Sequence, residues 1–232
     1  MKRLAVITAR GGSKRIPRKN IKDFCGKPIL AYSIRAAVEA GVFDEIMVST
    51  DDMEIAEIAK KYGAEIPFCR SEETANDFAV TAQVLGEVIG EYHKRGKNFD
   101  EVCCIYPTAP FVTGARLREA MESLSDTGAD SVLPVVRFSF PPQRGVKLNE
   151  GCLEYVYPQY RNTRSQDLEP WYHDVGQFYC IRVESFLRQR GLVMEKTVPL
   201  VLSEMEIQDI DTEEDWRLAE LKYRLLQETA NW

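Results

Sequence analysis

The chain has 232 residues, with 30 lysines and arginines against 36 aspartates and glutamates, and a formal net charge of -6 at pH 7. This acidic balance argues against a general nucleic-acid or membrane-surface binder, and no apolar run is long enough for a membrane span or the core of a signal peptide. A hydrophobic fraction of 44% suffices for a sizeable core. We therefore expect a single cytoplasmic domain over 1–232 that binds neither nucleic acid nor membrane.

Short apolar segments rich in β-branched residues alternate with helical patterns over the first 136 residues. Their periodicity predicts strands at 3–9, 45–50, 101–106 and 131–136. Between them it predicts helices that each end at a glycine, at 28–41, 53–63, 80–96 and 115–128. This alternation is typical of an α/β fold in which helices cover both faces of a parallel sheet.

The pattern breaks at about 138–175, where prolines, aromatics and arginines crowd into FSFPPQRGVKL and YVYPQYRNTRSQDLEPWYHD. This stretch is too long for a plain linker, so we interpret it as an irregular excursion that lines a pocket, a subunit interface, or both. A strand at 176–182 and an amphipathic helix at 211–228 complete the chain. The six cysteines form no CxxC pair, and we expect them to be buried, reduced thiols.

The segment ARGGSKRIPRKN, residues 9–20, follows the first predicted strand, and five of the ten residues from Arg10 to Lys19 are basic. It emerges at the carboxyl edge of a parallel sheet, where open α/β folds bind ligands. Glycines let backbone N–H groups approach a phosphate, and Arg and Lys supply charge. Neither the P-loop nor the dinucleotide-binding pattern is present. From the residues alone, an anion site and a solvated charged loop both remain open.

This segment, followed by GKPILAYSI, resembles the signature of the cytidylyltransferases that activate nine-carbon keto-sugar acids as CMP-sugars. These enzymes include the sialic acid (N-acylneuraminate) synthetases and their pseudaminic acid relatives. The resemblance runs nearly end to end, through VSTDD at 48–52, FCRSEETANDFAVTA at 68–82, PTAPF at 107–111 and QDIDTEEDW at 208–216. It implies a Rossmann-like, three-layer nucleotidyltransferase sandwich with a mainly parallel sheet, a small dimerisation excursion and a homodimer.

The resemblance also implies roles for individual residues toward CTP. The triphosphate would be held by Arg10, Ser13 and Lys19, in a cradle shaped by Gly11, Gly12, Lys14 and Asn20. The cytosine and ribose would meet Arg70 and the stretch 77–81, which includes Asp77, Ala79 and Thr81. The catalytic residues would be Lys19, Arg10 and Asp211. Arg70 has a second interpretation, as a surface charge at the end of a strand.

Asp209 and Asp211 are two positions apart, so an extended chain would point both carboxylates to one side. Such a pair suits Mg²⁺, which takes one or two carboxylates together with phosphate oxygens and water. From the segment alone, helix capping by Asp211 with Glu214 or by Thr212 with Asp215 is an equal alternative. Because the family places its metal at this DxD, the resemblance favours Mg²⁺. Asp51 and Asp52 precede a predicted helix and are interpreted as caps.

The acceptor sugar acid presents a carboxylate beside its anomeric hydroxyl, so it needs cationic and hydrogen-bonding groups. The excursion and its edge offer Gln143, Arg144, Lys147, Arg164, Gln166, His173 and Gln177. Each of them could equally be a surface charge or an interface contact. The sialic acid enzymes usually carry an extra arginine where this chain has His173 and often a glutamine where it has Tyr106. The resemblance therefore favours pseudaminic acid.

The expected reaction is an in-line attack of the anomeric hydroxyl on the α-phosphorus of CTP, with release of pyrophosphate. Lys19 and Arg10 would neutralise the departing pyrophosphate, and Mg²⁺ on the DxD would orient the oxygens. Two alternatives remain open at this point. One is a synthetase for sialic or legionaminic acid, and the other is a catalytically silent nucleotide-binding protein of the same fold.

Overall fold

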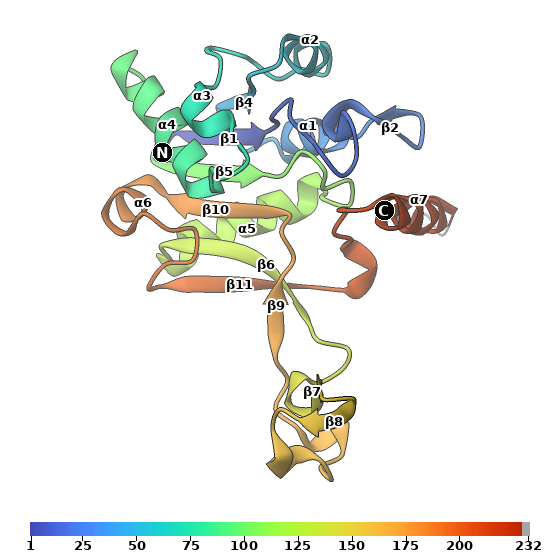
Figure 1. Ribbon diagram of the computed structural model, residues 1–232. Helices are drawn as coiled ribbons and strands as arrows, with labels where there is room; N and C mark the ends of the chain where they lie inside the picture. The colour runs from blue at the N-terminus through green and yellow to red at the C-terminus, as the bar shows by residue number, and fades with distance from the viewer. Residues whose placement is uncertain (229–232) are drawn as a thin grey trace.

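The computed structural model describes residues 1–228, which form a central seven-stranded sheet with helices on both sides (Figure 1). The strand order is β11-β6-β10-β5-β1-β4, and β9 also pairs with β6. Strands β1, β4, β5, β6 and β11 run in one direction, whereas β10 is antiparallel to β5 and β6. The strands are β1 (Arg3–Thr8), β4 (Glu45–Ser49), β5 (Glu101–Ile105), β6 (Ser131–Arg137), β9 (Tyr172–Asp174), β10 (Phe178–Arg182) and β11 (Thr197–Leu202).

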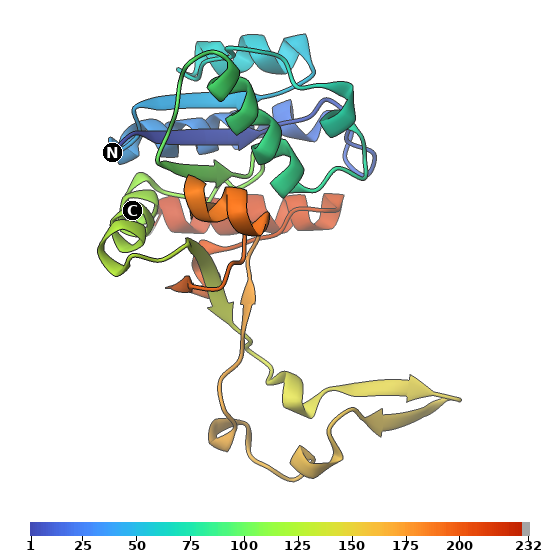
Figure 2. The same ribbon diagram turned by 90° about the vertical axis from the view of Figure 1, so that its left-hand side faces the viewer.

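Alternation along β1 sends successive side chains to opposite faces of the sheet. Ala5 and Ile7 pack in a core with α1 (Leu30–Ala40) and α5 (Gly114–Thr127), whereas Leu4 and Val6 pack in another with α4 (Thr81–Lys94) and α6 (Val183–Gln189). Figure 2 shows α4 and α6 together in front of the sheet. The three-layer sandwich is thereby confirmed, and its helices are α1 (Leu30–Ala40), α2 (Met53–Lys61), α3 (Glu72–Ala75), α4 (Thr81–Lys94), α5 (Gly114–Thr127), α6 (Val183–Gln189) and α7 (Glu213–Glu228).

A third core lies between α7 and the segment that carries the short strands β2 (Asp23–Phe24) and β3 (Lys27–Pro28). Its members include Ile16 of the basic loop, Ile210 of the DxD segment and Trp216 of α7. Ile16 is completely buried and Ile210 is 1% exposed. This cluster therefore brings residues 9–20 against residues 209–211, although about 190 positions separate them in the sequence.

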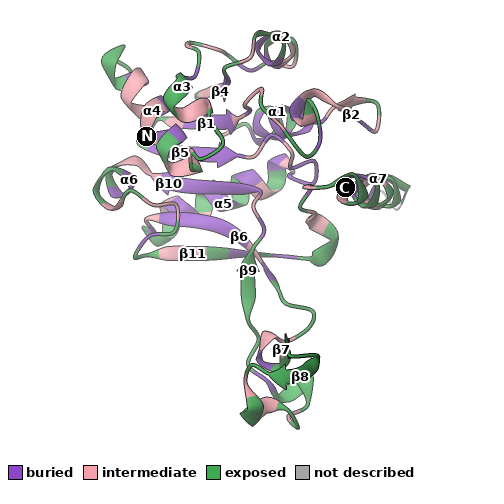
Figure 3. Ribbon diagram, in the orientation of Figure 1, coloured by how far each residue is buried: buried purple, intermediate pink, exposed green. Residues whose placement is uncertain are grey.

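The excursion is an arm that projects away from the sheet on β9 (Figures 1 and 2). It contains the hairpin β7 (Val146–Asn149) and β8 (Cys152–Tyr155) and short 3-10 turns at 142–144, 158–160 and 165–167. Figure 3 shows that most of it is exposed. Large apolar side chains lie on its surface, among them Phe140, Leu148 and Leu153, which are 87%, 80% and 71% exposed.

The predicted strands are present, each within two residues of its expected ends. Strand β11 and helix α6 were not predicted; Pro199 weakens the strand pattern, and a proline is tolerated because β11 lies at the sheet edge. The prediction that the cysteines are buried is wrong for Cys69 and Cys152, which are exposed. Among the described helices, none combines the length and hydropathy that a membrane crossing needs.

Candidate active site

A cleft of about 380 Å³ opens at the carboxyl edge of the parallel strands, where β1 passes into the basic loop. Its wall comes from the end of β1, the loop, the segment before α4 and the residues after β5. Among the described residues, four cationic side chains and a single carboxylate line the cleft, so the cleft favours an anionic ligand. The lining residues are Thr8, Arg10, Gly12, Ser13, Lys14, Arg15, Lys19, Asn20, Asp77, Pro107 and Thr108.

Backbone and side-chain contacts hold the basic loop in shape. The amide of Asn20 donates to the Arg10 carbonyl at 2.8 Å, and the Gly11 N–H donates to Asp51 Oδ1 at 2.9 Å. A Cβ on Gly11 would lie 2.8 Å from Asp52 Oδ2, whereas one on Gly12 would meet nothing within 4 Å. Gly11 is therefore required by the chain's own packing, and Gly12 is free to face a ligand.

Asp52 links the loop to α2. Its carboxylate caps the helix by accepting from the N–H groups of Glu54 and Ile55, which confirms the capping interpretation for Asp52. The same interpretation is wrong for Asp51, whose carboxylate accepts from the Gly11 N–H of the loop instead. Asp52 also pairs with Arg18, and that contact lowers the pKa of the Asp52 carboxyl. The helix end and the loop are thus fixed by one side chain.

The basic loop and the DxD segment meet at Lys19. Its Nζ donates to the Ile210 carbonyl at 2.6 Å and lies 3.6 Å from Asp211 Oδ1. Arg15 Nη2 lies 2.8 Å from the same carboxylate oxygen. Burial lowers the pKa of Lys19, while the charges of Asp211 and Asp209 oppose that shift. A cation and an acidic pair therefore face each other across one site.

The DxD carboxylates remain outside the helix cap. The Asp215 N–H donates to Thr212 Oγ1 at 3.2 Å, and Asp215 Oδ2 accepts from the N–H groups of Asp211 and Thr212. The capping alternative thus holds for Thr212 with Asp215. Ile210 between them turns into the third core, and the charges of Asp209 and Asp211 both act on Lys19.

Within residues 1–228 no group of three or more His, Cys, Asp or Glu side chains gathers as metal ligands. Two carboxylates that both act on Lys19 still suit a hard cation that completes its shell with phosphate oxygens and water. The donor set is therefore compatible with Mg²⁺ and a poor match for a closed zinc site.

Of the residues predicted to meet the base and ribose, Asp77 lines the cleft, whereas Arg70, Ala79 and Thr81 do not. In the cleft, Asp77 pairs with Lys14 and, at 2.6 Å, with Arg10. Arg70 is buried and donates to the hydroxyl of Ser49 at 3.0 Å and to its carbonyl at 2.8 Å, so its interpretation as a surface charge is wrong. Ala79 lies in the turn before α4. The first residue of that helix, Thr81, has its Oγ1 3.0 Å from the Tyr106 hydroxyl.

Residues 4–198 match the sequence model of a family described as cytidylyltransferase. The chain belongs to the cytidylyltransferase family. It is 39% identical over 231 residues to a pseudaminic acid cytidylyltransferase of Campylobacter jejuni, covering 99% of this chain and 100% of that one. It is 36% identical over 237 residues to a CMP-N,N'-diacetyllegionaminic acid synthase of Legionella pneumophila, covering 98% and 99%.

Among solved structures, this cytidylyltransferase resembles a CMP:2-keto-3-deoxy-manno-octonic acid synthetase complexed with CTP. The TM-score is 0.68 over 98% of this chain and 100% of that one, at 19% identity. A structural similarity at this level of identity shows the fold, and the substrate has to be inferred from the residues of the site.

The residues predicted to meet the sugar lie mostly on the arm of the cytidylyltransferase. Lys147 pairs with Glu154 and Arg164 with Asp167, each at 3.0 Å. The Gln143 amide donates to the Glu169 carbonyl, and the Arg144 guanidinium donates to the Ser165 hydroxyl. Gln166 follows Ser165 in the chain. The His173 ring lies 4.7 Å from the ring of Phe138.

Gln177 lies apart from the other predicted sugar residues. Its carbonyl accepts from the Tyr106 N–H at 2.8 Å, beside the end of β5, and its side chain donates to the Glu206 carbonyl at 2.8 Å. Tyr106 is followed by Pro107, which lines the cleft. Gln177 is therefore the predicted sugar residue that the described chain places next to its own cleft.

A polar chain that the sequence did not indicate joins the arm to the cleft. The Tyr179 hydroxyl donates to Asp174 Oδ2 at 2.7 Å, and the rings of Tyr179 and Tyr106 lie 5.7 Å apart. Burial raises the pKa of both phenols, so they stay neutral donors at physiological pH. Asp174 ends β9, and Tyr106 contacts Thr81 at the start of α4. Only the strand register, which no local pattern reveals, brings these groups together.

Proposed function

We propose that this cytidylyltransferase transfers CMP from CTP to the anomeric hydroxyl of pseudaminic acid and releases pyrophosphate. The observation that carries the proposal is the 3.6 Å separation of Lys19 Nζ and Asp211 Oδ1 beside the cationic cleft. That arrangement supplies fixed positive charge for a triphosphate and fixed negative charge for a metal ion at one reacting centre.

The cleft residues suit the nucleotide in shape and charge. Arg10, Lys14 and Lys19 line it and can neutralise the β- and γ-phosphates that leave as pyrophosphate. The space beside Gly12 allows a phosphate to approach the backbone closely. Because Lys19 is largely removed from water, its charge acts in a medium of low dielectric constant and is more effective than a surface lysine.

Asp209 and Asp211 are proposed to hold Mg²⁺. When bound, the ion would supply charge neutralisation at the α-phosphate and polarise the attacking hydroxyl. The chain's own contribution is to hold Asp211 next to Lys19 and Asp209 near enough for its charge to act on the same lysine. An in-line attack needs such positioning and needs no covalent enzyme intermediate.

The acceptor is proposed from the residues beside the cleft and from the relatives. His173 and Tyr106 occupy positions where the sialic acid enzymes usually differ, and a pseudaminic acid relative matches the full length at 39% identity. The legionaminic acid relative, at 36% over nearly the same length, makes legionaminic acid the second candidate.

A homodimer is proposed as the active form. Most predicted sugar residues lie on an arm that carries large exposed apolar side chains and projects from the sheet. A second copy packed on this arm would bury those side chains and could bring the arm's polar residues to the partner's cleft.

The test is a substrate panel. Purified protein receives CTP, MgCl₂ and one of pseudaminic, legionaminic or N-acetylneuraminic acid, and pyrophosphate release is measured. We expect the highest kcat/KM with pseudaminic acid and no release without Mg²⁺. Turnover of another acid with none of pseudaminic acid would refute the acceptor assignment, and CTP binding without release for any acid would indicate a silent binder.

A further inference from the structure

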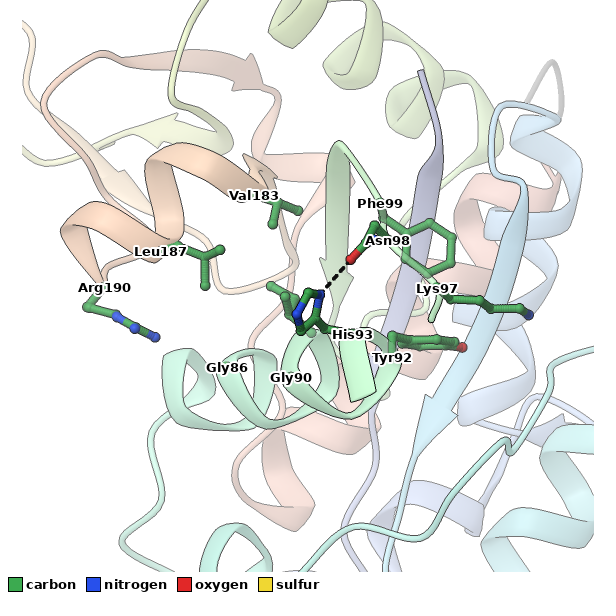
Figure 4. A pocket seen from close by; sticks show the side chains of 11 residues that line it. Gly86, Gly90, Tyr92, His93, Lys97, Asn98, Phe99, Val183, Leu187 and Arg190 are labelled. Carbon is green, nitrogen blue, oxygen red and sulfur yellow. Dashed lines mark hydrogen bonds between the residues drawn. The ribbon is translucent and has the colours of Figure 1, made fainter. Parts of the chain in front are cut away.

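A second hollow, of about 340 Å³, lies between α4, the segment 97–99 and α6 (Figure 4). It sits at the amino end of β5, where the Asp100 N–H bonds to the Lys2 carbonyl and the Val183 N–H to the Asp100 carbonyl. The hollow is thus at the edge of the sheet opposite the active-site cleft and shares no lining residue with it. Its walls are mostly apolar and come from Gly86, Ile89, Gly90, Tyr92, His93, Lys97, Asn98, Phe99, Val183, Leu187 and Arg190.

Two glycines in the interior of α4 open this hollow. Gly86 and Gly90 are four residues apart and therefore lie on the same side of the helix. A Cβ at either position would meet nothing within 4 Å. Alanine would favour the helix by about 1 kcal/mol at each site, so the packing of the described chain gives no reason for glycine. Their effect is to leave room in front of α4, as Figure 4 shows.

Arg190 supplies unbalanced charge at the rim. Lys97 is paired with Glu45 at 2.6 Å, and His93 Nδ1 lies 2.9 Å from Asn98 Oδ1. Among residues 1–228, by contrast, the Arg190 side chain has no ion pair or hydrogen bond. Its backbone is left-handed, with φ of 59°, at the end of α6, a position that favours glycine. Figure 4 shows the side chain extending from α6 toward α4.

We propose that this hollow binds a small amphipathic carboxylate. The apolar part would pack on Ile89, Phe99 and Leu187, and the carboxylate would accept from the Arg190 guanidinium. The volume is at the low end of the range for ligand sites, about 300–1,000 Å³, which suits a short acyl chain or a single ring. A concave site walled by three segments, with one uncompensated cation, fits such an anion better than a flat partner helix.

The experiment is isothermal titration of the full chain with octanoate and with octanamide, its neutral counterpart. We expect one octanoate per chain and about fivefold weaker binding of octanamide, the effect of one partly exposed ion pair. The same titrations are repeated on Gly90→Leu, which fills the hollow, and on Arg190→Gly, which removes the charge. Pyrophosphate release from all three proteins should be equal, since neither residue belongs to the active site.

The variants separate a ligand site from a structural feature. Gly90→Leu should abolish octanoate binding. Arg190→Gly should remove the preference for octanoate over octanamide and at the same time raise Tm, because glycine tolerates the left-handed backbone. If Gly90→Leu fails to fold, Arg190→Gly still decides the question. The proposal is overturned by an absence of octanoate binding at millimolar concentration, by binding that both variants retain, or by a self-association that Gly90→Leu abolishes without any octanoate binding.

Discussion

Replacing Asp211 by Asn tests the acidic pair beside the cleft with little disturbance to the fold. The Asp211 side chain is 40% exposed and its partner Arg15 is 67% exposed, so the lost ion pair should cost no more than about 1 kcal/mol of stability. The cap of α7 is preserved because it uses Thr212 and Asp215. Catalysis should suffer far more: loss of a metal-binding carboxylate next to Lys19 is expected to lower kcat/KM for CTP by about 10²–10³, or roughly 3–4 kcal/mol.

The matched control is Asp215→Ala, four residues away on the same segment. That change removes the acceptor of three hydrogen bonds from residues 211 and 212 and should cost about 1 kcal/mol, or roughly 2–4 °C in Tm. Its kcat/KM should stay within about tenfold of the parent. Pyrophosphate release gives the rates and calorimetry gives Tm. If Asp211→Asn keeps its rate, or loses Tm and rate in the same proportion as Asp215→Ala, the assignment of Asp211 to catalysis is wrong.

Three further predictions concern the loop and the arm. Gly11→Ala should destabilise the protein by about 1–3 kcal/mol, since its Cβ would lie 2.8 Å from Asp52, whereas Gly12→Ala should leave Tm unchanged yet weaken CTP binding in titrations. Equal effects of the two changes would contradict this view of the cradle. Burial lowers the pKa of Lys19, so activity that needs its charge should fall as the pH rises, at a pH below the ordinary lysine pKa of about 10.4. The Lys19→Arg variant should lose this alkaline decrease in activity. If the decrease persists in that variant, Lys19 is not its source. Leu148→Glu on the arm should yield monomers by light scattering with little change in Tm, and an unaltered mass would refute the dimer surface.

Local patterns were sufficient for the layers of the fold and for the basic loop. Hydrophobic periodicity and glycine helix ends are short-range signals, so the strands and the main helices could be read from neighbouring residues. The charges of the basic loop were visible in the same way, and its binding of an anion stays a prediction. The antiparallel direction of β10 could not be predicted from neighbouring residues, because the partners of a strand are set by the whole sheet. The same holds for β11, whose Pro199 weakens the local signal and is compatible with an edge strand.

The side chains of the site also divide into those whose contacts follow from sequence neighbours and those whose contacts depend on distant segments. The loop's charges and the capping by Asp52 follow from sequence neighbours. The buried position of Arg70 depends on its bonds to Ser49, which lies 21 positions earlier at the end of β4. The link from Tyr179 to Asp174 likewise depends on how β9 and β10 leave the sheet. Composition identified 138–175 as an excursion, but it carried no information on where that arm would point.

The contact between the basic loop and the DxD segment depends on apolar residues rather than on charge. Between Arg15 and Arg18, Ile16 is the apolar residue that turns inward, and Ile210 does the same between Asp209 and Asp211. Both enter the core built on Trp216, and burying side chains of this size is worth about 1.5–3 kcal/mol each. The exposed ion pair of Arg15 with Asp211 contributes at most about 1 kcal/mol. The isoleucines therefore fix the separation of Lys19 and Asp211, which leaves the charges at the surface of that core free to exchange partners when an anion or a metal ion binds.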